Sequence, residues 1–281
     1  MKKSTFLLFT LGMILHAAFS QAFAYDNLYV IGDGCAAAWN QSEAIEMTNA
    51  GNDIFTWRGS LIGNGRFKFL LARNTWDALS CEFETNTENI VISPDIETDI
   101  YERPNVAGNN DVCFKVSETA VYDIVINTAT MKIIVTKNTT DPDLHQLYLA
   151  GGATPCEWNI GSFIKMTKLS EGEFFWYGNL SGGDGHIQFL SLQKWEIRIG
   201  PATNQTVFTS GAEYNLQRVD NRFIANASNS GLYEVYINLK TMKAKFTKAP
   251  DLSQLYMVGD ATSVQWTPSG NAPLTKIANG V

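Results

Sequence analysis

The 281-residue sequence is poor in the residues from which most metal and catalytic sites are built. It has three histidines and four cysteines, with no Cys-x-x-Cys spacing and no cysteine–histidine cluster. Such spacing is the usual mark of a zinc site. Only His145 and His186 follow the N-terminal leader, so a Ser–His–Asp arrangement cannot be assembled from the pattern. We therefore expect no metal and no cofactor.

Long apolar runs are also lacking after residue 24. Before that point Lys2 and Lys3 precede an apolar stretch, 6–19, that is too short to span a bilayer, and Ala22-Phe-Ala24 is a small-x-small cleavage site. This pattern predicts an export signal over residues 1–24. Tyr25 follows the signal, so no cysteine for lipid attachment is visible at this position.

Positive charge is scarce. Lysine and arginine number 21 against 28 acidic residues, which gives a net charge of −7. Nucleic acids and anionic membrane surfaces attract basic faces, so neither is expected as a partner. A negative net charge is compatible with a neutral ligand. It is equally compatible with a charge whose only role is to keep the protein soluble.

An internal repeat organises what is present. The stretch Leu28–Gly34 returns at 147–153 and 255–261, and a tryptophan follows eleven residues after the first leucine of each copy. A period above 100 residues indicates whole domains rather than solenoid units. We predict a first repeat at 25–138, a second at 141–249, and the start of a truncated third at 252–281, which is too short to bury a core. Short linkers that contain proline should hold neighbouring repeats at restricted angles.

Alternation of apolar residues predicts β-structure in both repeats. Phe55, Trp57 and Leu61 share one face of a strand at 53–61, and Phe67 and Phe69 face inward while Arg66 and Lys68 face outward. Period two is typical of half-buried antiparallel strands, and no segment carries a convincing helical stripe. The segments 127–130 and 238–241 read as hairpin turns. The predicted fold class is all-β, with tandem immunoglobulin-like antiparallel β-sandwich domains.

Comparison of the two repeats argues against two interpretations, a nucleotide-binding site and a glycoside hydrolase. Gly32–Ala37 fits a nucleotide-binding fingerprint, but its counterpart in the second repeat contains Pro155 and lacks the pattern. Glycoside hydrolysis usually needs two carboxylates. Asp33 is the best-placed acid, yet its counterpart is Gly152, and no acid pair recurs. We therefore predict that the protein is not an enzyme.

The cysteines permit two interpretations. All four, Cys35, Cys81, Cys113 and Cys156, lie in the exported part, where disulfides are allowed. None recurs at an equivalent position. Cys81 and Cys113 could bridge the long loop between them, or the cysteines are buried thiols that act as small apolar residues.

Tryptophan is the main functional signal. Trp57 and Trp176 lie on inward strand faces and are assigned to the core. A different group lies outside any strand pattern or just past a strand that carries a polar residue on its outer face: Trp39, Trp158 and Trp266, then Trp76 beyond Lys68 and Trp195 beyond Gln188. Exposed indole rings with a polar neighbour can stack on the C–H face of a sugar. The alternative is that these rings plug one end of the sandwich, and both interpretations stay open.

The motif string resembles the repeated modules of the SusE/SusF family. It runs Leu-Tyr-x-x-Gly-Asp-Ala, Trp-Asn, Met-Thr, Phe-x-Trp-x-Gly-x-Leu and Phe-Lys-Phe-Leu, then Trp, and covers nearly all of residues 27–281. The family comprises outer-membrane starch-binding proteins of Bacteroidetes. The resemblance implies non-catalytic domains that hold starch or malto-oligosaccharides for an uptake system. By position, the implied carbohydrate-binding residues are Trp39, Lys68, Trp76, Trp158, Gln188 and Trp195.

Two features depart from that family. Its members are normally anchored through a cysteine after the signal, which is absent here, and Gln188 stands where the first repeat has Lys68. The resemblance places the protein in the envelope, at the outer membrane or cell surface, while a periplasmic or secreted location stays open. The alternative function is that of a structural, adhesion or protein-interaction β-sandwich protein of the envelope without glycan binding.

Overall fold

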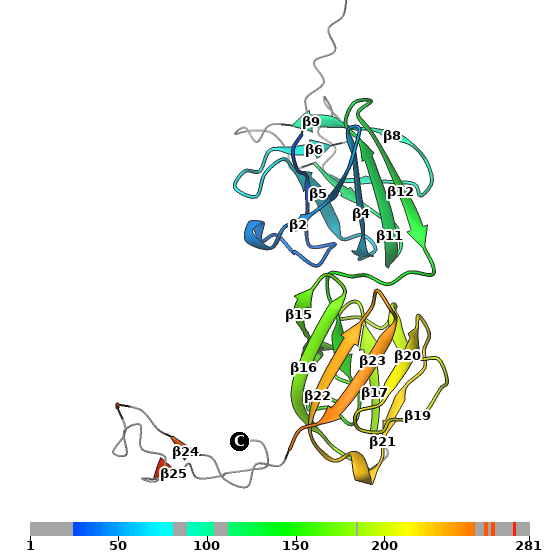
Figure 1. Cartoon of the computed structure of the whole chain (residues 1–281). Helices are drawn as coiled ribbons and strands as arrows, with labels where there is room; N and C mark the ends of the chain where they lie inside the picture. The colour runs from blue at the N-terminus through cyan, green and yellow to red at the C-terminus, as the bar shows by residue number, and fades with distance from the viewer. Residues whose placement is uncertain are drawn as a thin grey trace, which may run out of the picture.

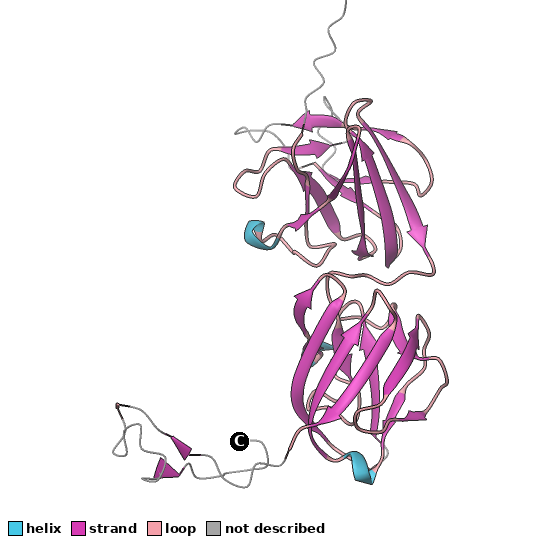
Figure 2. Cartoon of the chain, in the orientation of Figure 1, coloured by secondary structure: helices cyan, strands magenta, loops and turns pink. Residues whose placement is uncertain are grey.

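The computed structural model describes residues 25–80, 89–103, 112–183 and 185–250, together with 256–257, 260–261 and 272–273. The predicted export signal, Cys81 and Trp266 lie outside this part of the chain. The described residues form strands and three single turns of 3-10 helix, with no α-helix among them (Figures 1 and 2). None of their helices could therefore span a membrane. The predicted all-β class is confirmed.

The strands of the first repeat form two facing sheets. One has the order β2-β1-β5-β10-β7, with β6 beside β5 and β9 beside β6, and the other has the order β3-β4-β11-β12-β8. Every pair is antiparallel except β7 with β10. The elements are β1 (Tyr29–Ile31), η1 (Gln41–Glu43), β2 (Ile45–Glu46), β3 (Thr48–Gly51), β4 (Ile54–Leu61), β5 (Arg66–Leu70), β6 (Ala78–Ser80), β7 (Asn89–Val91), β8 (Thr98–Asp99), β9 (Tyr101–Arg103), β10 (Cys113–Lys115), β11 (Ala120–Asn127) and β12 (Lys132–Asn138).

The second repeat has the same two layers, but they join into one sheet that approaches a barrel. Its order is β14-β13-β17-β18-β20-β23-β22-β16-β15, because β20 pairs with β18 on one side and with β23 on the other. The elements are β13 (Tyr148–Ala150), η2 (Ile160–Ser162), β14 (Ile164–Lys165), β15 (Thr167–Ser170), β16 (Glu173–Leu180), β17 (Gly185–Leu190), β18 (Arg198–Pro201), β19 (Thr206–Val207), β20 (Glu213–Gln217), β21 (Phe223–Ala225), η3 (Ala227–Asn229), β22 (Gly231–Asn238) and β23 (Lys243–Lys248).

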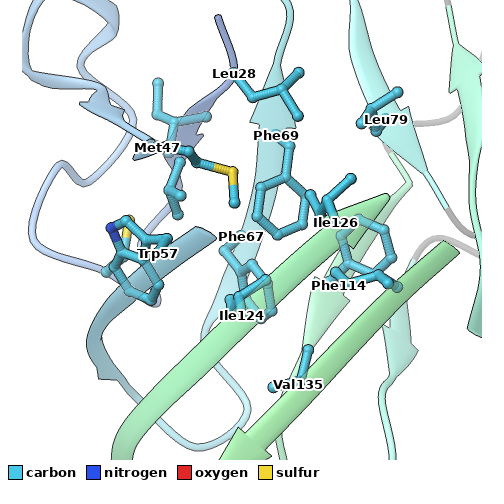
Figure 3. Packing of buried hydrophobic residues seen from close by; sticks show 14 of the residues in the cluster. Leu28, Met47, Trp57, Phe67, Phe69, Leu79, Phe114, Ile124, Ile126 and Val135 are labelled. Carbon is cyan, nitrogen blue, oxygen red and sulfur yellow. The ribbon is translucent and has the colours of Figure 1, made fainter. Parts of the chain in front are cut away.

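Each repeat encloses a core of its own. In the first repeat the inward residues of β4, β5, β10 and β11 meet between the sheets, and phenylalanine rings stand edge to face at the centre, such as Phe67 against Phe69. Figure 3 shows this packing. The second repeat has an equivalent cluster around Phe189, Phe223 and Phe246. The alternation that predicted these strands therefore arises from two buried inner faces.

The Phe-x-Trp-x-Gly motif is explained by packing along one strand. The indole of Trp57 lies over Gly59, where a Cβ atom would come within 2.2 Å of its Cζ2 atom. Trp176 lies over Gly178 in the same way, at 2.3 Å. Only glycine leaves room for the ring at this position.

The predicted hairpin turns at 127–130 and 238–241 each extend by one residue, a methionine. Met131 and Met242 precede the strands, because β12 begins at Lys132 and β23 at Lys243. Both methionines have φ of 51°, in the left-handed region. An asparagine at the start of each turn closes it, because the Asn127 and Asn238 side chains accept the backbone N–H groups of Thr130 and Thr241. Each methionine therefore ends a turn rather than starting a strand.

The two repeats meet at a junction that the linker builds. Asp143, 1 % exposed, accepts the Ser60 N–H of β4 at 3.0 Å, and the imidazole of His145 stacks on Trp57 with ring centroids 5.6 Å apart. Burial lowers the pKa of His145, so the ring is neutral at pH 7. An apolar cluster joins Val121 of the first repeat to Leu192 and Ile197 of the second.

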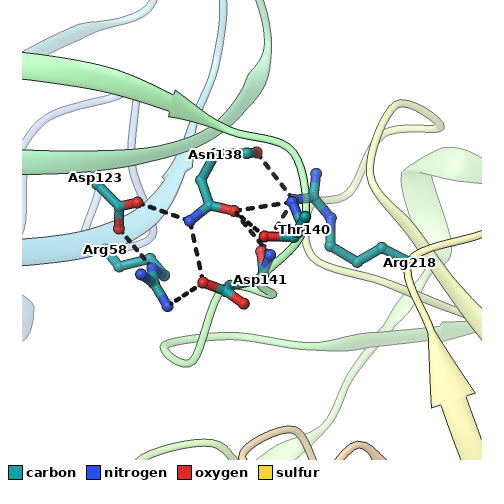
Figure 4. Close-up of polar contacts among 6 residues, drawn as sticks. All are labelled: Arg58, Asp123, Asn138, Thr140, Asp141 and Arg218. Atoms are coloured by element: carbon teal, nitrogen blue, oxygen red, sulfur yellow. Dashed lines mark hydrogen bonds and ion pairs between the residues drawn. The ribbon is translucent and has the colours of Figure 1, made fainter.

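A polar network covers this linker (Figure 4). Arg58 pairs with Asp123 and with Asp141, whose carboxylate lies 2.7 Å from the guanidinium. From the second repeat, Arg218 donates to the carbonyl oxygens of Asn138 and Asp141 at 2.9 and 3.0 Å. The linker is thus contacted by side chains of both repeats, and the restricted angle between the repeats stays a prediction.

Trp176 is only half-buried, whereas Trp57 is 5 % exposed. Both were expected in the core. Trp57 is covered by His145 of the linker that follows its repeat, and the corresponding linker residue after the second repeat, Ser253, lies outside the described residues. Beyond it, β24 (Tyr256–Met257) pairs with β25 (Ala272–Pro273).

Candidate functional site

Trp39 lies in a closed loop after β1. The Gly32 N–H donates to the Ala38 carbonyl at 2.7 Å, and Ala38 adopts the left-handed conformation with φ of 48°. Asn40, which follows Trp39, caps η1 because its side chain accepts the Ser42 N–H. In the Trp-Asn motif, the tryptophan thus supplies an aromatic ring and the asparagine caps the 3-10 helix that follows. No α-helix follows this glycine turn within the described residues, which agrees with setting aside the nucleotide fingerprint.

Trp76 comes from a second loop, between β5 and β6. The Leu71 N–H donates to the Asp77 carbonyl at 3.0 Å and closes this loop. Gln41 joins the two loops, because its Nε2 donates to the Thr75 carbonyl at 2.8 Å. The Trp39 and Trp76 rings meet with centroids 6.4 Å apart and planes tilted by 51°.

Lys68 of β5 lies beneath both rings. Its Nζ is 5.6 Å from the centroid of Trp39 and 5.2 Å from that of Trp76, within cation–π range. Alternation placed Lys68 on the outer face of the strand, where it is, but the side chain is only 6 % exposed. The two loops fold over it, which a strand pattern cannot reveal.

Arg66 lies at the edge of the same site. Its guanidinium is 5.2 Å from the Trp39 centroid, and it pairs with Asp33 at 3.1 Å. The Arg66 N–H also donates to Asp33 at 2.6 Å. Burial alone would raise the pKa of Asp33, but the hydrogen bonds and charge of Arg66, with the Trp39 indole nearby, lower it. Asp33 therefore orients an arginine, and its carboxylate is ionised at neutral pH.

The second repeat builds the same pair of rings. Trp158 and Trp195 lie with centroids 5.8 Å apart and planes tilted by 44°. Gln188, 1 % exposed, takes the place of Lys68, and its Nε2 donates to Asp220 at 2.8 Å. Its Oε1 has no hydrogen-bond partner among the described residues. Asp220 also pairs with Arg198, which lies 5.8 Å from the Trp195 centroid.

The cation beside the first ring comes from different residues in the two repeats. The positions of Asp33 and Arg66 are occupied by Gly152 and His186, so the first-repeat ion pair is missing. Arg222 instead reaches Trp158 at 5.2 Å from its centroid. Period two could have found Arg66, two residues before Lys68. Nothing in the repeat marks Arg198, Asp220 or Arg222.

All four paired rings are half-buried. Trp39 and Trp76 also pack against the core, and Trp39 Nε1 is buried without a hydrogen bond of normal geometry. Within each pair the two rings contact each other, with centroids 6.4 and 5.8 Å apart. Each pair forms one bent apolar surface bordered by positive charge.

A separate groove of about 460 Å³ lies on the outer face of the second repeat, over β16, β20, β22 and β23. Phe175 and Tyr236 contribute rings, and Glu213 pairs with Lys243 on its wall. None of the paired tryptophans lines it.

Two cysteines are buried thiols. Cys35 contacts the Gly32 carbonyl and Cys156 the Leu149 carbonyl. Burial raises the pKa of Cys35 to about 12. A bridge between Cys81 and Cys113 stays a prediction, because Cys81 lies outside the described residues.

Comparison with known proteins gives remote similarity to solved structures only. No protein-family model matches the chain, and no curated protein matches it. Among solved structures, the crystal structure of SusF from Bacteroides thetaiotaomicron matches over 86 % of this chain and 52 % of that one, with 14 % identity and a TM-score of 0.30. The chain thus spans about half the length of that structure, and a TM-score this low does not establish a common fold.

Proposed function

We propose that this chain is a non-catalytic carbohydrate-binding protein that holds starch-type α-glucan chains on its tryptophan pairs. The observation that carries the proposal is the recurrence of one constellation in both repeats. Two rings from two separate loops meet at 6.4 and 5.8 Å, with similar tilts and arginines beside them. The sequence resemblance to starch-binding modules supports the choice of glucan.

The chemistry of such a surface suits a sugar chain. Indole faces stack on the C–H faces of pyranose rings, while charged and amide groups at the rim offer partners to hydroxyls. Rings tilted by 51° and 44° form a bent surface. A bent surface favours a chain whose successive sugars turn, as in α-1,4-glucan, over a flat chain such as cellulose.

The two sites should differ in strength. Lys68 places a cationic donor against both rings of the first pair. Its counterpart Gln188 is engaged with Asp220, which is itself held by Arg198. We therefore assign the first repeat as the stronger site. In the cell, the proposed role is glycan capture at the envelope for outer-membrane uptake proteins.

A structural role for the tryptophan pairs is the second candidate. The half-burial of all four rings and the packing of Trp39 and Trp76 against the core favour it. Under this alternative the protein would act in adhesion or protein interaction without glycan.

Affinity electrophoresis of the mature protein separates the candidates. We expect retardation in gels that contain amylopectin but not in gels with xylan or a soluble cellulose derivative. A variant with both Trp76→Ala and Trp195→Ala should migrate as in plain gels. Migration unaffected by every glycan would reject the proposal and leave the structural role. Release of reducing sugar from starch by the purified protein would contradict the non-catalytic assignment.

A further inference from the structure

The groove on the outer face of the second repeat is large enough for a ligand of its own. Its volume of about 460 Å³ lies within the range of roughly 300–1,000 Å³ that is typical of small-molecule sites. The lining comes from β16, β22, β23 and β20, which lie side by side in that order (Figure 1). Three strand spacings separate β16 from β20, or about 14 Å. The groove is therefore longer than a single sugar ring.

The groove and the tryptophan pair of the second repeat lie on opposite sides of its core. Trp195 packs against Leu190, on the side of β17 that points away from the core, while Phe189 of the same strand points into it. In the other layer Phe246 of β23 points into the core, and its neighbour Lys245 lines the groove. One core thus separates the two surfaces, so a ligand in the groove does not compete for the tryptophan pair.

Two half-buried rings form the apolar part of the groove. Phe175 of β16 lies directly opposite Tyr236 of β22 in the strand register, so their Cβ atoms are about 5 Å apart. The corresponding opposite pair in the first repeat is Thr56 and Val125. The two rings therefore occur in the second repeat alone, and the first repeat builds the same strand pair without them.

The Tyr236 ring is fixed by a carboxylate at the end of its hydroxyl. The Tyr236 hydroxyl donates to Glu173 Oε1 at 2.7 Å, and Asn238 Nδ2 donates to the same oxygen at 3.1 Å. The Ser170 hydroxyl donates to Glu173 Oε2 at 2.8 Å. A ring that is already held before a ligand arrives loses little conformational freedom on binding.

The charged side chains of the groove balance one another. They are two glutamates and two lysines, and one of each, Glu213 and Lys243, pair at 3.1 Å. The other two, Glu234 and Lys245, have no hydrogen bond or ion pair within the described part of the chain. They are diagonal neighbours across β22 and β23, with Cβ atoms about 7 Å apart. The groove thus offers one free acceptor and one free donor, and its lining has no net charge.

We propose that this groove binds a neutral oligosaccharide chain. Phe175 and Tyr236 stack on the C–H faces of the sugars, while Glu234 accepts from one hydroxyl and Lys245 donates to another. A lining without net charge gives a charged polymer no attraction, and an apolar ligand would cover both free charges without pairing them. The choice of a sugar rests on the proposed function, but the groove shares no residue with the tryptophan pairs.

The affinity of the groove should be modest. It is open on one side, so a bound chain is contacted on a single face, and we expect binding in the millimolar range. Such binding is too weak to retard the protein in a gel once the tryptophan pairs are removed.

A titration of the mature chain with maltoheptaose, followed by NMR of the backbone amides, reads the groove and the tryptophan pairs separately. The amide of Lys245 should shift at millimolar sugar, in addition to amides around Trp158 and Trp195. Phe175→Thr combined with Tyr236→Val gives the second repeat the residues of the first, so this double variant should fold. It should weaken binding at the groove by about tenfold or more, through the loss of stacking contacts, and leave the tryptophan pair unchanged.

Tyr177→Ser is the matched control. This ring lies on β16 and is 51 % exposed, but it does not line the groove, so its removal should leave the titration unchanged. Equal weakening by Tyr177→Ser and by the double variant would overturn the proposal, because the sugar would then lie outside the groove. A Lys245 amide that does not shift at millimolar maltoheptaose would also overturn it.

The same titration distinguishes failure of the groove from failure of the proposed function. Shifts around the tryptophan pairs without a shift at Lys245 would leave the proposed function standing and reject the groove. A shift at Lys245 that the double variant removes, without shifts around the tryptophan pairs, would support the groove and reject the tryptophan pairs as sugar sites.

Discussion

Trp76→Ala is the substitution that best separates a sugar-binding ring from a structural plug. A fully buried tryptophan removes about 150–250 Å² from water. Trp76 is half-buried, so the substitution removes about 100 Å² of buried apolar surface. At about 25 cal/mol per Å² this lowers the free energy of unfolding by about 2.5 kcal/mol. The lost contact with Lys68 adds about 0.5–1 kcal/mol. The first repeat should therefore be weakened but still fold.

The same variant should lose much of its glycan affinity. One stacking contact is worth about 1–3 kcal/mol by analogy with base stacking on aromatic side chains. Titration calorimetry with a malto-oligosaccharide measures this loss on folded protein, and urea unfolding measures stability in parallel. Trp57→Ala is the control. That ring is 5 % exposed, so its removal should cost about 3–5 kcal/mol of stability, and binding should fall only as the protein unfolds.

One result would refute the assignment of Trp76. If Trp76→Ala lowered the urea midpoint as far as Trp57→Ala and the remaining folded protein bound glycan with unchanged affinity, the ring would be a plug. Half-burial makes a moderate stability loss compatible with both roles, so the affinity measurement decides.

Three further outcomes follow from the contacts in the first repeat. Gly59→Ala should lower the urea midpoint by an amount equivalent to about 1–3 kcal/mol, because the new methyl group overlaps the Trp57 ring and overpacks the core; an unchanged midpoint would contradict that packing. Asp33 has a lowered pKa, so its pairing with Arg66 stabilises the fold above the ordinary carboxyl range and is lost as pH falls through the folded-state pKa; the stability difference between the unmodified protein and Asp33→Asn, measured by urea unfolding from pH 7 to pH 3, should shrink on acidification. Cys35, with its pKa raised to about 12, should resist iodoacetamide at pH 8 in the folded protein and react in denaturant, as mass spectrometry would show.

Sequence periodicity predicted the strands because they have one buried face. The inward positions of β4 and β11 are those that alternation selects, and Trp57 lies opposite Ile124 in their register. The tryptophans of the two pairs could also be identified from the sequence, since the repeat shows which rings lie outside the strands. The way their rings contact each other could not be predicted, because it depends on a loop-to-loop hydrogen bond from Gln41 to Thr75, 34 residues apart.

Burial of polar residues was the least predictable feature. Lys68 lies on the expected face of β5, but its burial depends on two loops that close over it. Asp143 looked like an ordinary linker acid, and only the fold brings it to the Ser60 N–H, 83 residues away. Such contacts leave no local periodicity.

The two repeats reach one arrangement through different residues, and this bears on the function. In the first repeat Arg66, held by Asp33, lies against Trp39, and in the second Arg222 lies against Trp158. A plug requires only apolar volume, which leucine or phenylalanine would supply without a cation at the ring. Indole pairs bordered by guanidinium groups instead combine a flat apolar face with fixed hydrogen-bond donors at its edge. That combination is what recognition of a hydroxylated ring requires, and its presence in both repeats favours glycan binding over a purely structural role.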